Sequence, residues 1–537
     1  MFIHRITKKN KKKTYTTILL QKSFRNKKTN SPRHKTIANL SDWSEELIEN
    51  FEKLLKGGKI SDVNNLSEIL HTEQGKIYGG IKTVLDLCVR LGINKAINNK
   101  RMCFLTNIMI AGFINGEKFS KNFLANEWSK LQAIDEVFGK QGYWNEDDLY
   151  ETLEWLNNNQ KKIEKKLFER KYGKKPESKI IFLYDVTASY VEGSDIDLSS
   201  YGYPRDGKPA KEQIVIGMMT DNEGDPICIE VFQGNTLDYK TVESQLNKIK
   251  NEYGVEKIVF VGDRGMIKST QINSIKENDN WYYITAITKS QIEKMLKDDI
   301  IQYSLFDSEL CEIKYENTRY ILKKNPIRTE EIKSNLNDKI ERLKNIIDKK
   351  NKYLKEHKKA SLESAKKFIS KYCETRKLNK IINIQTSGKT FSFTKNEDEI
   401  KEHLKLAGCY VIKSNVSEKE LSKEQIHSGY KNLAKVEHGF QKLKTALINL
   451  RPLFVRLETH IRGHVFACML ALKVALYMEK ELKPLDFTFQ YCLKALNSIQ
   501  TINYTFQNKK ICCLPDKFSD DNEKILKQLT LNWEKVL

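Results

Sequence analysis

Hydrophobic positions recur with different periods in different parts of the chain. Between Asp42 and about Gly173 they are spaced as on one face of a helix, as in Trp43, Leu47 and Phe51. We therefore expect an all-helical region here, with a further helix opening at Asn145-Glu-Asp-Asp148. The sequence leaves open whether this region is a scaffold or binds specific DNA, because we find no helix-turn-helix signature in it.

Between Lys179 and Thr288 the pattern changes to short apolar runs that are typical of buried strands. The predicted strands are residues 180–186, 213–220, 226–232, 257–262 and 281–288, and the predicted helices are residues 239–253 and 268–279. Turn sequences at Gly207-Lys-Pro209 and Asn222-Glu-Gly-Asp225 indicate hairpins between the first three strands, and the helical crossovers indicate parallel pairing of the last two. This order predicts an α/β fold with a mixed five-stranded sheet of ribonuclease H type.

The pattern changes again at about Lys289, where short strand-like segments flank a long Lys-rich helix. In this helix Ile332, Leu336, Ile340, Leu343 and Ile347 repeat at helical spacing. They could pair two copies of the chain or pack within the segment. We interpret the segment as an α+β insertion, after which helices return at residues 423–450 and 458–482.

Six segments follow from these changes of pattern. They are a basic β arm or hairpin (1–38), a mainly helical N-terminal domain (39–175) with DNA binding as one of its two open roles, the first part of the α/β core (176–288), the Lys-rich insertion (289–424), the second part of the core (425–485) and a helical C-terminal tail (486–537).

The charge of the chain is concentrated in two of these segments. The 537 residues carry a net charge of +22, and residues 1–38 contain 12 Lys and Arg with no Asp or Glu. Residues 319–380 contain 20 Lys and Arg against 8 Asp and Glu, so the rest of the chain is close to neutral. Two separate basic segments predict a polyanionic partner.

Location is inferred from cysteines and hydropathy. The ten cysteines contain no C-x-x-C pair, which favours reduced thiols over a disulfide framework or a zinc site. The longest apolar run, Val465 to Met478, is interrupted by Lys473 and is shorter than a membrane span. We expect a cytoplasmic, nucleoid-associated protein that makes no membrane contact.

Two aspartates lie at positions that suggest a functional role for a carboxylate. Asp185 lies inside an apolar strand, and Asp263 ends the strand Ile258–Gly262. A single Asp at a strand end is more often a turn or capping residue. In the predicted strand order, however, the first and fourth strands are neighbours, so these two carboxylates could face each other and share divalent cations.

A third acid lies on the helix after the insertion. Tyr430, Glu437 and Lys444 follow the helical period, so a phenol, a carboxylate and an ammonium group share one face. On the spacing alone, an ordinary solvated face is the better interpretation.

At this point the sequence resembles the DDE transposases of bacterial insertion sequences, in the branch with a Y-(2)-R-(3)-E-(6)-K signature and an insertion before the catalytic Glu. Tyr430, Glu437 and Lys444 match this signature, whereas Leu433 occupies the Arg position. Further matching motifs are Asp185-Val-Thr-Ala188, Gly202-Tyr-Pro-Arg-Asp-Gly-Lys208, Glu230-Val-Phe-Gln-Gly-Asn-Thr236, Gly262-Asp-Arg-Gly-Met266, Leu450-Arg-Pro452 and Ile461-Arg-Gly-His464.

The resemblance implies that Asp185, Asp263 and Glu437 are catalytic and bind two Mg²⁺ ions, for which Mn²⁺ can substitute. Two such ions would activate the attacking oxygen and stabilise the leaving oxygen of a phosphodiester. It also implies phosphate contacts from Tyr430 and Lys444. Other candidate DNA contacts are Arg264, Lys431 and Lys435, the last two as replacements for the missing Arg.

The function implied is that of a transposase that works as a homodimer. It would bind the inverted-repeat ends of an insertion sequence, cleave them by Mg²⁺-dependent hydrolysis and join the 3′-OH to target DNA. Two alternatives stay open, namely an inactive relative that represses at the ends and a stand-alone nuclease or resolvase. His460 and His464 are spaced as half of a metal site, but no third ligand is evident and packing is the better interpretation.

Overall fold

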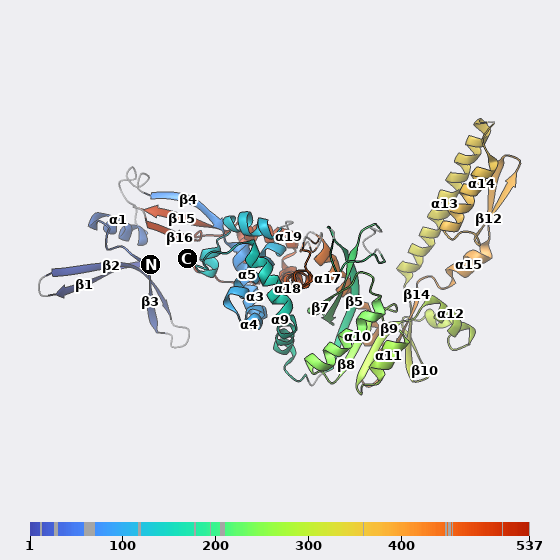
Figure 1. Ribbon diagram of the computed structural model, residues 1–537, viewed down its shortest axis with the longest axis horizontal. Helices are drawn as coiled ribbons and strands as arrows, with labels where there is room; N and C mark the ends of the chain where they lie inside the picture. The colour runs from blue at the N-terminus through green and yellow to red at the C-terminus, as the bar shows by residue number, and fades with distance from the viewer. Residues whose placement is uncertain are drawn as a thin grey trace. The chain divides into compact units, whose positions relative to one another are not determined.

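The computed structural model describes residues 1–10, 13–25, 31–57, 70–115, 120–176, 179–193, 195–203, 210–357, 359–445, 448, 450, 453, 455–506 and 509–535 (Figure 1). The expected turn at residues 207–209 and four lysines of the N-terminal basic clusters (11, 12, 27 and 28) lie outside these ranges. The chain forms two compact units, which are described separately. The first is Met1–Lys76, Gln500–Asp516 and Glu534–Leu537, and the second is Ile77–Ile499 and Lys517–Trp533.

The first unit begins with an antiparallel sheet of β1 (Phe2–Asn10), β2 (Lys13–Arg25) and β3 (Pro32–Asn39). Helix α1 (Glu45–Leu55) starts at the N-cap Ser44. Its buried Ile48 shares an apolar core with Ile18 and Leu20 of β2. The expected boundary at residue 38 is therefore wrong, because α1 covers the apolar face of these strands and belongs with them.

A second small sheet in this unit has the order β16-β15-β4 and joins distant parts of the sequence. Its strands are β4 (Leu70–Ile77), β15 (Gln500–Phe506) and β16 (Lys509–Cys513). The helical tail expected at 486–537 is thus wrong in part, and β4 interrupts the region expected to be all-helical. Residues 500–506 alternate Thr and Asn with Ile and Tyr, which suits a strand, but their partner β4 lies more than 420 residues earlier.

The second unit combines a helical part with a large sheet. The helices of this part are α3 (Gly79–Leu91), α4 (Ile93–Ile97), α5 (Lys100–Ile114), α6 (Lys121–Phe123), α7 (Ser129–Leu131), α8 (Ile134–Phe138), α9 (Glu146–Tyr172), α18 (Glu458–Leu482), α19 (Phe489–Asn497) and α20 (Asp520–Gln528), with the π-helical turn η1 (Leu124–Trp128) and the 3₁₀ turn η4 (Lys483–Leu485). The start of α9 is as predicted, because Asn145 and Asp148 form a reciprocal capping box.

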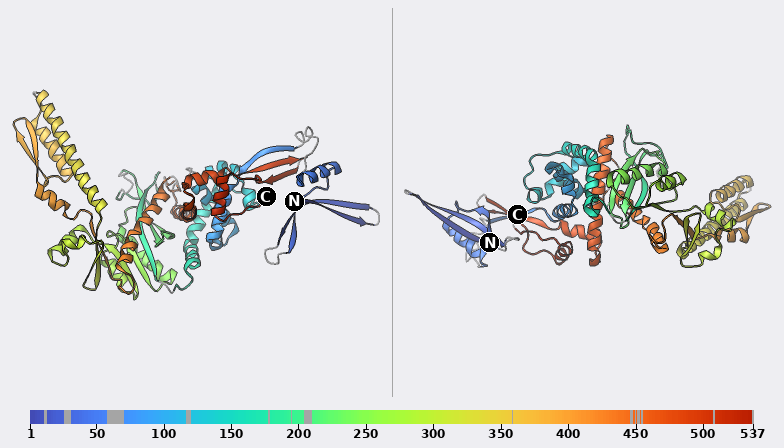
Figure 2. Two further views of the ribbon diagram at one scale, coloured as in Figure 1. Left: turned by 180° about the vertical axis from the view of Figure 1, so that it is seen from behind. Right: turned by 90° about the horizontal axis from the view of Figure 1, so that it is seen from below.

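Helix α18 is the centre of this unit and packs against α5, α9 and β7 (Figure 2). A Cβ atom on Gly463 would lie 1.9 Å from the backbone oxygen of Leu153, so glycine is needed where α18 and α9 cross. The segment Glu458–Leu485 is long and apolar enough to cross a membrane, but 78% of its most apolar window is buried inside the protein. Its apolarity is that of a core helix.

The sheet of the second unit has eight strands in the order β10-β11-β14-β9-β8-β5-β6-β7. Five of them lie where the sequence predicts strands: β5 (Ile180–Tyr190), β6 (Gln213–Asp221), β7 (Pro226–Phe232), β8 (Ile258–Gly262) and β9 (Trp281–Ala286). β5, β8 and β9 are parallel, and the other pairs are antiparallel. Helices α10 (Asp238–Lys248), continued by η2 (Ile249–Tyr253), and α11 (Ser269–Lys276) form the crossovers.

The number of strands differs from the predicted five because the insertion extends the sheet. β14 (Cys409–Ser414) pairs with the free edge of β9, and β11 (Thr318–Lys324) and β10 (Cys311–Tyr315) follow outward. An exposed sheet edge offers unpaired backbone groups, and the insertion satisfies them. The pairing joins positions about 130 residues apart, such as Ile412 with Ala286, which no local pattern reveals.

The rest of the insertion has an apolar core of its own. It contains α12 (Lys289–Lys297), η3 (Tyr303–Phe306), α13 (Pro326–Glu356), α14 (Leu362–Thr375), β12 (Ile382–Ser387), β13 (Thr390–Lys395) and α15 (Glu397–Lys405). Leu336, Ile340, Leu343 and Ile347 of α13 are buried against α14 and Phe391. Of the two uses left open for these residues, packing within the insertion is the one present in this structure.

Candidate active site

The strand register brings the two aspartates to one level of the sheet. Tyr184 of β5 is paired with Gly262 of β8 in parallel register, so the next residues, Asp185 and Asp263, come at the same edge. For β8 this is the carboxyl end, where ligands of α/β sheets commonly bind, whereas β5 continues to Tyr190 beyond Asp185. The expectation that the first and fourth predicted strands are neighbours is confirmed, because β5 pairs with β8.

Glu437 reaches the same edge from a helix that lies close to the sheet. The helix expected over residues 423–450 is in fact two, α16 (Lys423–Lys431) and α17 (Leu433–Lys444), with Asn432 between them. Leu433, Val436 and Phe440 form the buried face of α17, and Glu437 is on the exposed face. Gly439 permits the close approach, because a Cβ there would lie 2.8 Å from Met218 of β6.

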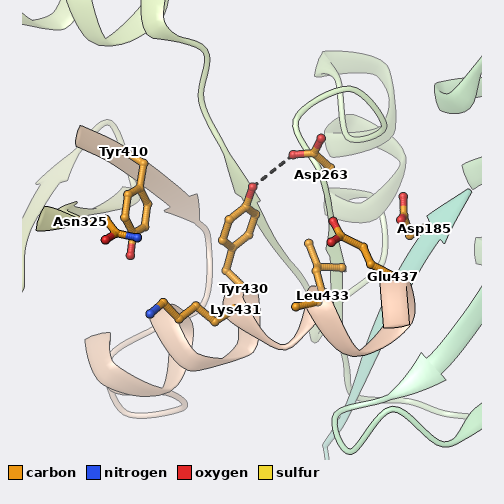
Figure 3. A pocket seen from close by; sticks show the side chains of 9 residues that line it. Asp185, Asp263, Asn325, Tyr410, Tyr430, Lys431, Leu433 and Glu437 are labelled. Atoms are coloured by element: carbon orange, nitrogen blue, oxygen red, sulfur yellow. Dashed lines mark hydrogen bonds between the residues drawn. The ribbon is translucent and has the colours of Figure 1, made fainter. Parts of the chain in front are cut away.

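These elements surround one pocket with a volume of about 330 Å³. The residues lining it are Asp185, Asp263, Asn325, Tyr410, Tyr430, Lys431, Leu433, Ala434 and Glu437. Figure 3 shows the side chains of Asp185, Asp263 and Glu437 around the pocket, with Glu437 coming from α17. The structure thus gathers around one cavity three acids that are 78 and 174 positions apart in sequence.

Tyr430 of α16 is hydrogen-bonded to one of these acids. Its hydroxyl donates a hydrogen bond to Asp263 Oδ1 at 3.1 Å (Figure 3). Burial raises the pKa of Tyr430, and the neighbouring Asp263 carboxylate raises it further. The phenol therefore stays protonated below pH 10 and acts as a neutral donor.

Two residues of the insertion, Asn325 and Tyr410, also line the pocket, which sequence reasoning missed. Asn325 is the N-cap of α13, where its side-chain oxygen accepts from the Arg328 backbone nitrogen. The Tyr410 hydroxyl lies 2.6 Å from Nε2 of His427. Burial and two lysines lower the pKa of His427, so its ring is neutral and can accept a hydrogen bond from the phenol hydroxyl. This hydrogen bond fixes Tyr410 in place. The Asn-Pro pair signals a helix start, but nothing local signals either residue as part of a site.

The five predicted DNA contacts separate in the structure. Tyr430 and Lys431 line the pocket, whereas Arg264, Lys435 and Lys444 are not among its lining residues. Lys435 instead donates to the backbone oxygen of Asn222 at 2.7 Å. Leu433, in the position of the expected Arg, is 8% exposed and contributes an apolar wall.

The turn between β6 and β7 holds the start of α17. Asn432 donates its side-chain amide to the side-chain oxygen of Asn222 at 2.9 Å, next to the Lys435 contact. Asp225 fixes the turn in its place, because Lys171 of α9 and Lys473 of α18 bind it at 2.8 and 2.6 Å. The turn therefore connects the Glu437 helix to both long helices of the unit.

The three acids are of the residue type that binds divalent metal ions, but their carboxylates are not grouped closely enough in this structure to hold one. Carboxylate oxygens are the ligands that hard divalent cations prefer. In the described ranges, however, no three Asp, Glu, His or Cys side chains are arranged closely enough to hold an ion. His460 and His464 do not converge, since His460 stacks on Tyr150 and the buried His464 lies 3.4 Å from Lys121 Nζ.

Of the sequence motifs, residues 204–208 and the Arg-Pro pair at 451–452 lie outside the described residues. Gly202, which precedes β6, packs against the backbone of Gly234, which follows β7, so the second and third motifs meet there.

Comparison with known proteins gives two family matches. Residues 176–473 match the family described as "Transposase DDE domain", and residues 3–64 match "IS1634 family transposase, N-terminal domain". No curated protein matches the chain. Among solved structures it is similar to a chain of a "piggyBac transposase synaptic complex with hairpin DNA", with 9% identity, a TM-score of 0.37 and 78% of each chain covered.

Proposed function

The chain belongs to the DDE transposase family of insertion sequences, and on this premise we propose that it cleaves the ends of such an element and joins them to target DNA. The observation that carries the proposal is that Asp185, Asp263 and Glu437 all line the same pocket. Its two strands and helix supply acids from three separate segments, and the insertion closes one side of it.

DDE transposases generally use divalent metal ions. We propose that Asp185, Asp263 and Glu437 bind two Mg²⁺ ions, which supply Lewis acidity to the attacking and leaving oxygens of the phosphodiester when bound. Mn²⁺ would satisfy the same ligands.

In the proposed reaction, water attacks a phosphodiester at the transposon end, the P–O3′ bond breaks and a 3′-OH is released. This 3′-OH then attacks a phosphodiester of the target DNA, and a target 3′-OH leaves. Lys431, exposed at the pocket, provides the phosphate contact expected from the missing Arg. Arg264, Lys435 and Lys444 contact DNA outside the pocket, and two copies of the chain act on the two ends.

The five parallel and antiparallel strands from β7 to β9 form the ribonuclease H-like core of this proposal. Their order, with β5 between β8 and β6, supports it. The extension by β14, β11 and β10 supports a second role for the insertion, which is to bring Asn325 and Tyr410 to the pocket.

The decisive experiment uses DNA that carries the inverted repeats flanking the gene. Glu437→Gln should remove Mg²⁺-dependent cleavage of these ends while the dissociation constant stays within about 2-fold, because the substitution removes a metal ligand and no cation that contacts phosphate. Glu424→Gln, an exposed Glu of α16, is the matched control and should cleave normally.

Each outcome separates the alternatives. Cleavage without joining to target DNA would indicate a stand-alone nuclease. Specific binding with no cleavage by the unmodified protein would indicate an inactive, repressing relative. Cleavage by the Glu437→Gln variant would show that the acid is assigned wrongly.

A further inference from the structure

The edge of the large sheet at β7 is closed by side chains. A strand at a sheet edge has unpaired backbone N–H and C=O groups, which can pair with another chain unless they are covered. Gln160 of α9 donates to the backbone oxygen of Ile229 at 2.6 Å, and Glu164 accepts from the backbone nitrogen of Ile229 at 3.2 Å. Arg462 of α18 donates to the backbone oxygen of Val231 at 2.7 Å. Helices α9 and α18 therefore prevent a further strand from adding to β7.

The two-stranded ribbon β12–β13 of the insertion has one edge that is closed in the same way. This ribbon packs beside α13 (Figures 1 and 2). The side chain of Asn351 on α13 donates to the backbone oxygen of Phe391 on β13 and accepts from its backbone nitrogen, both at 2.8 Å. The asparagine thus satisfies both backbone groups of Phe391, as a neighbouring strand would.

The opposite edge of the ribbon, formed by β12, is open. Phe391 is paired with Thr386, and its N–H and C=O bind Asn351, so this pair makes no hydrogen bond across the ribbon. Because antiparallel pairs alternate, the N–H and C=O of Thr386, and those of Ile384 two positions away, point out of the ribbon. Among the described residues, no backbone or side-chain group binds these outward N–H and C=O groups.

The sequence of β12 also contains none of the usual protection of an edge strand. Such strands are commonly blocked by charged side chains, Pro or a bulge. Each of the other described edge strands, β1, β3, β4, β7, β10, β13 and β16, contains at least one charged residue. β12, with the sequence Ile-Asn-Ile-Gln-Thr-Ser, has neither charge nor Pro, and its register with β13 has no bulge. An open, uncharged edge in a Lys-rich insertion is therefore a docking strand.

This edge fits a strand of protein better than it fits DNA. Its outward groups alternate between N–H and C=O, and the carbonyl oxygens would face the phosphates of a nucleic acid. The side chains on the exposed face of β12 are Asn383, Gln385 and Ser387. They are uncharged, and each can both donate and accept hydrogen bonds. A partner strand with the same properties would satisfy the backbone groups and these side chains together.

We propose that β12 pairs with β12 of a second copy of this chain, antiparallel about a two-fold axis. Ile384 of one copy exchanges two hydrogen bonds with Thr386 of the second copy, and the symmetry repeats this pair. All the outward N–H and C=O groups of these residues are then satisfied. Ile382 is not needed, because its N–H already donates to the backbone oxygen of Leu378.

The same register determines which side chains meet. Gln385 lies opposite its own copy, and Asn383 lies opposite Ser387 of the second copy, so no like charges are directly opposed. Lysines outside the strand, such as Lys380 and Lys389, repel those of the second copy at longer range. The contact is therefore weak between free copies and strengthens when DNA holds two copies together, which is the one respect in which it rests on the proposed function.

The test is a disulfide between two copies of the full-length protein, formed by mild oxidation with diamide and without DNA or metal. Gln385→Cys should give a covalent dimer, because opposed residues of a non-hydrogen-bonded pair have Cα atoms about 4.5 Å apart, as a disulfide requires. The ten native cysteines lie outside the ribbon, and the unmodified protein measures their background.

The matched control is Ser392→Cys, which is exposed on the same face of the ribbon but lies on β13. Strands are about 4.8 Å apart, so two copies of this residue would lie about 14 Å apart in the paired dimer. Its thiols meet only by diffusion, whereas paired thiols have an effective concentration of about 1 mM. Ser392→Cys should therefore give at least about 10-fold less dimer than Gln385→Cys.

Two further experiments test the register and the backbone pairing. A mixture of the Asn383→Cys and Ser387→Cys proteins should form a disulfide, whereas either protein alone should not. Adding Thr386→Pro to Gln385→Cys removes an N–H that the ribbon does not use, and should reduce the dimer to the level of the Ser392→Cys control. Thr386→Val keeps this N–H and should leave the dimer unchanged.

Equal crosslinking of Gln385→Cys and Ser392→Cys, or no crosslinking of either, would overturn the proposal. A dimer that persists with Thr386→Pro would overturn it as well. Raising the NaCl concentration from about 50 to about 500 mM should increase the dimer, because salt screens the repulsion between lysines, and a decrease would contradict the pairing.

Thermal melting of each variant checks that the loss of dimer is not a loss of folding. Because neither DNA nor metal is present, failure here leaves the Glu437 test unaffected, and a negative Glu437 test leaves this one interpretable.

Discussion

The acid pocket and the α13–α14 hairpin are built in opposite ways. The pocket gathers side chains between Asp185 and Glu437, a span of 252 positions, and they come from β5, the end of β8, the start of α13, β14, α16 and α17. The hairpin is one continuous segment with its own apolar core. The pocket is acidic with one lysine at its edge, whereas the hairpin is crowded with lysines.

This difference suggests a division of labour between the two regions. Carboxylates at the centre repel a phosphodiester unless cations are bound there, so affinity for DNA has to come from elsewhere. Lysines on a hairpin that has its own apolar core can supply it without disturbing the acids. Substitutions in the pocket should therefore alter the rate of reaction, and substitutions on the hairpin should alter affinity.

The largest effect is expected for the aspartates of the pocket. Asp185→Asn and Asp263→Asn should each lower the single-turnover cleavage rate more than about 100-fold. Removing even a residue that only hydrogen-bonds to a metal ligand lowers activity about 10- to 100-fold, and removing the ligand itself should cost more. Affinity for DNA, measured by fluorescence anisotropy, should stay within about 2-fold. Asp197→Asn, an exposed aspartate after β5, serves as the control. A loss of affinity as large as the loss of rate would contradict the idea that the pocket sets the rate and the hairpin sets the affinity.

Reversing charge on the hairpin should give the next largest effect. Lys349→Glu/Lys355→Glu/Lys366→Glu should weaken binding at low salt by about 10-fold or more and make it less dependent on salt, by a slope of about 0.9 for each phosphate that is no longer neutralised. The cleavage rate at saturating DNA should not change. The control is Lys297→Glu on α12, which lies outside the α13–α14 hairpin. An unchanged salt slope would mean that the hairpin does not bind phosphates.

A smaller effect is expected at the turn that holds α17. Asn432→Ala removes the hydrogen bond to Asn222 and should cost about 1 kcal/mol of folding free energy. Since this hydrogen bond positions the helix of Glu437, the cleavage rate should fall several-fold with affinity unchanged. Asn497→Ala, which breaks an Asn–Asn hydrogen bond elsewhere in the unit, should match the stability loss without the loss of rate. If both variants cleave alike, the turn has no positioning role.

The smallest effect is expected for Tyr430→Phe. It removes one partly exposed hydrogen bond and frees an oxygen of Asp263, so we expect less than about a 5-fold change in rate and a lower metal concentration at half-maximal rate. The raised pKa of Tyr430 keeps the phenol neutral below pH 10, so the variant and the unmodified protein should have pH–rate profiles of the same shape from pH 6 to 9. A profile that loses a basic limb in the variant would contradict this.

Much of the fold follows from local patterns. The five strands from β5 to β9 in sequence, the cap at Asn145 and the apolar repeat of α13 are all readable, because each depends on neighbours within a few residues. The three acids could also be proposed from the sequence, Asp185 from its place inside an apolar strand, Asp263 from its place at a strand end and Glu437 through the spacing of a motif. No local pattern predicts the pairing of β14 with β9 or of β15 with β4. The residues of one strand do not indicate which other strand will form hydrogen bonds with it.

The sequence by itself therefore determined the five core strands and the two basic segments, and it offered the three acids as candidates. Tertiary structure alone decided that Asn325 and Tyr410 join the pocket, that Lys431 faces it while Lys435 binds a turn, and that Leu433 forms a wall. The physical reason is that residue type and period fix which face of an element is apolar. Which other elements meet that face depends on pairing and packing over hundreds of residues, and the site is made where they meet.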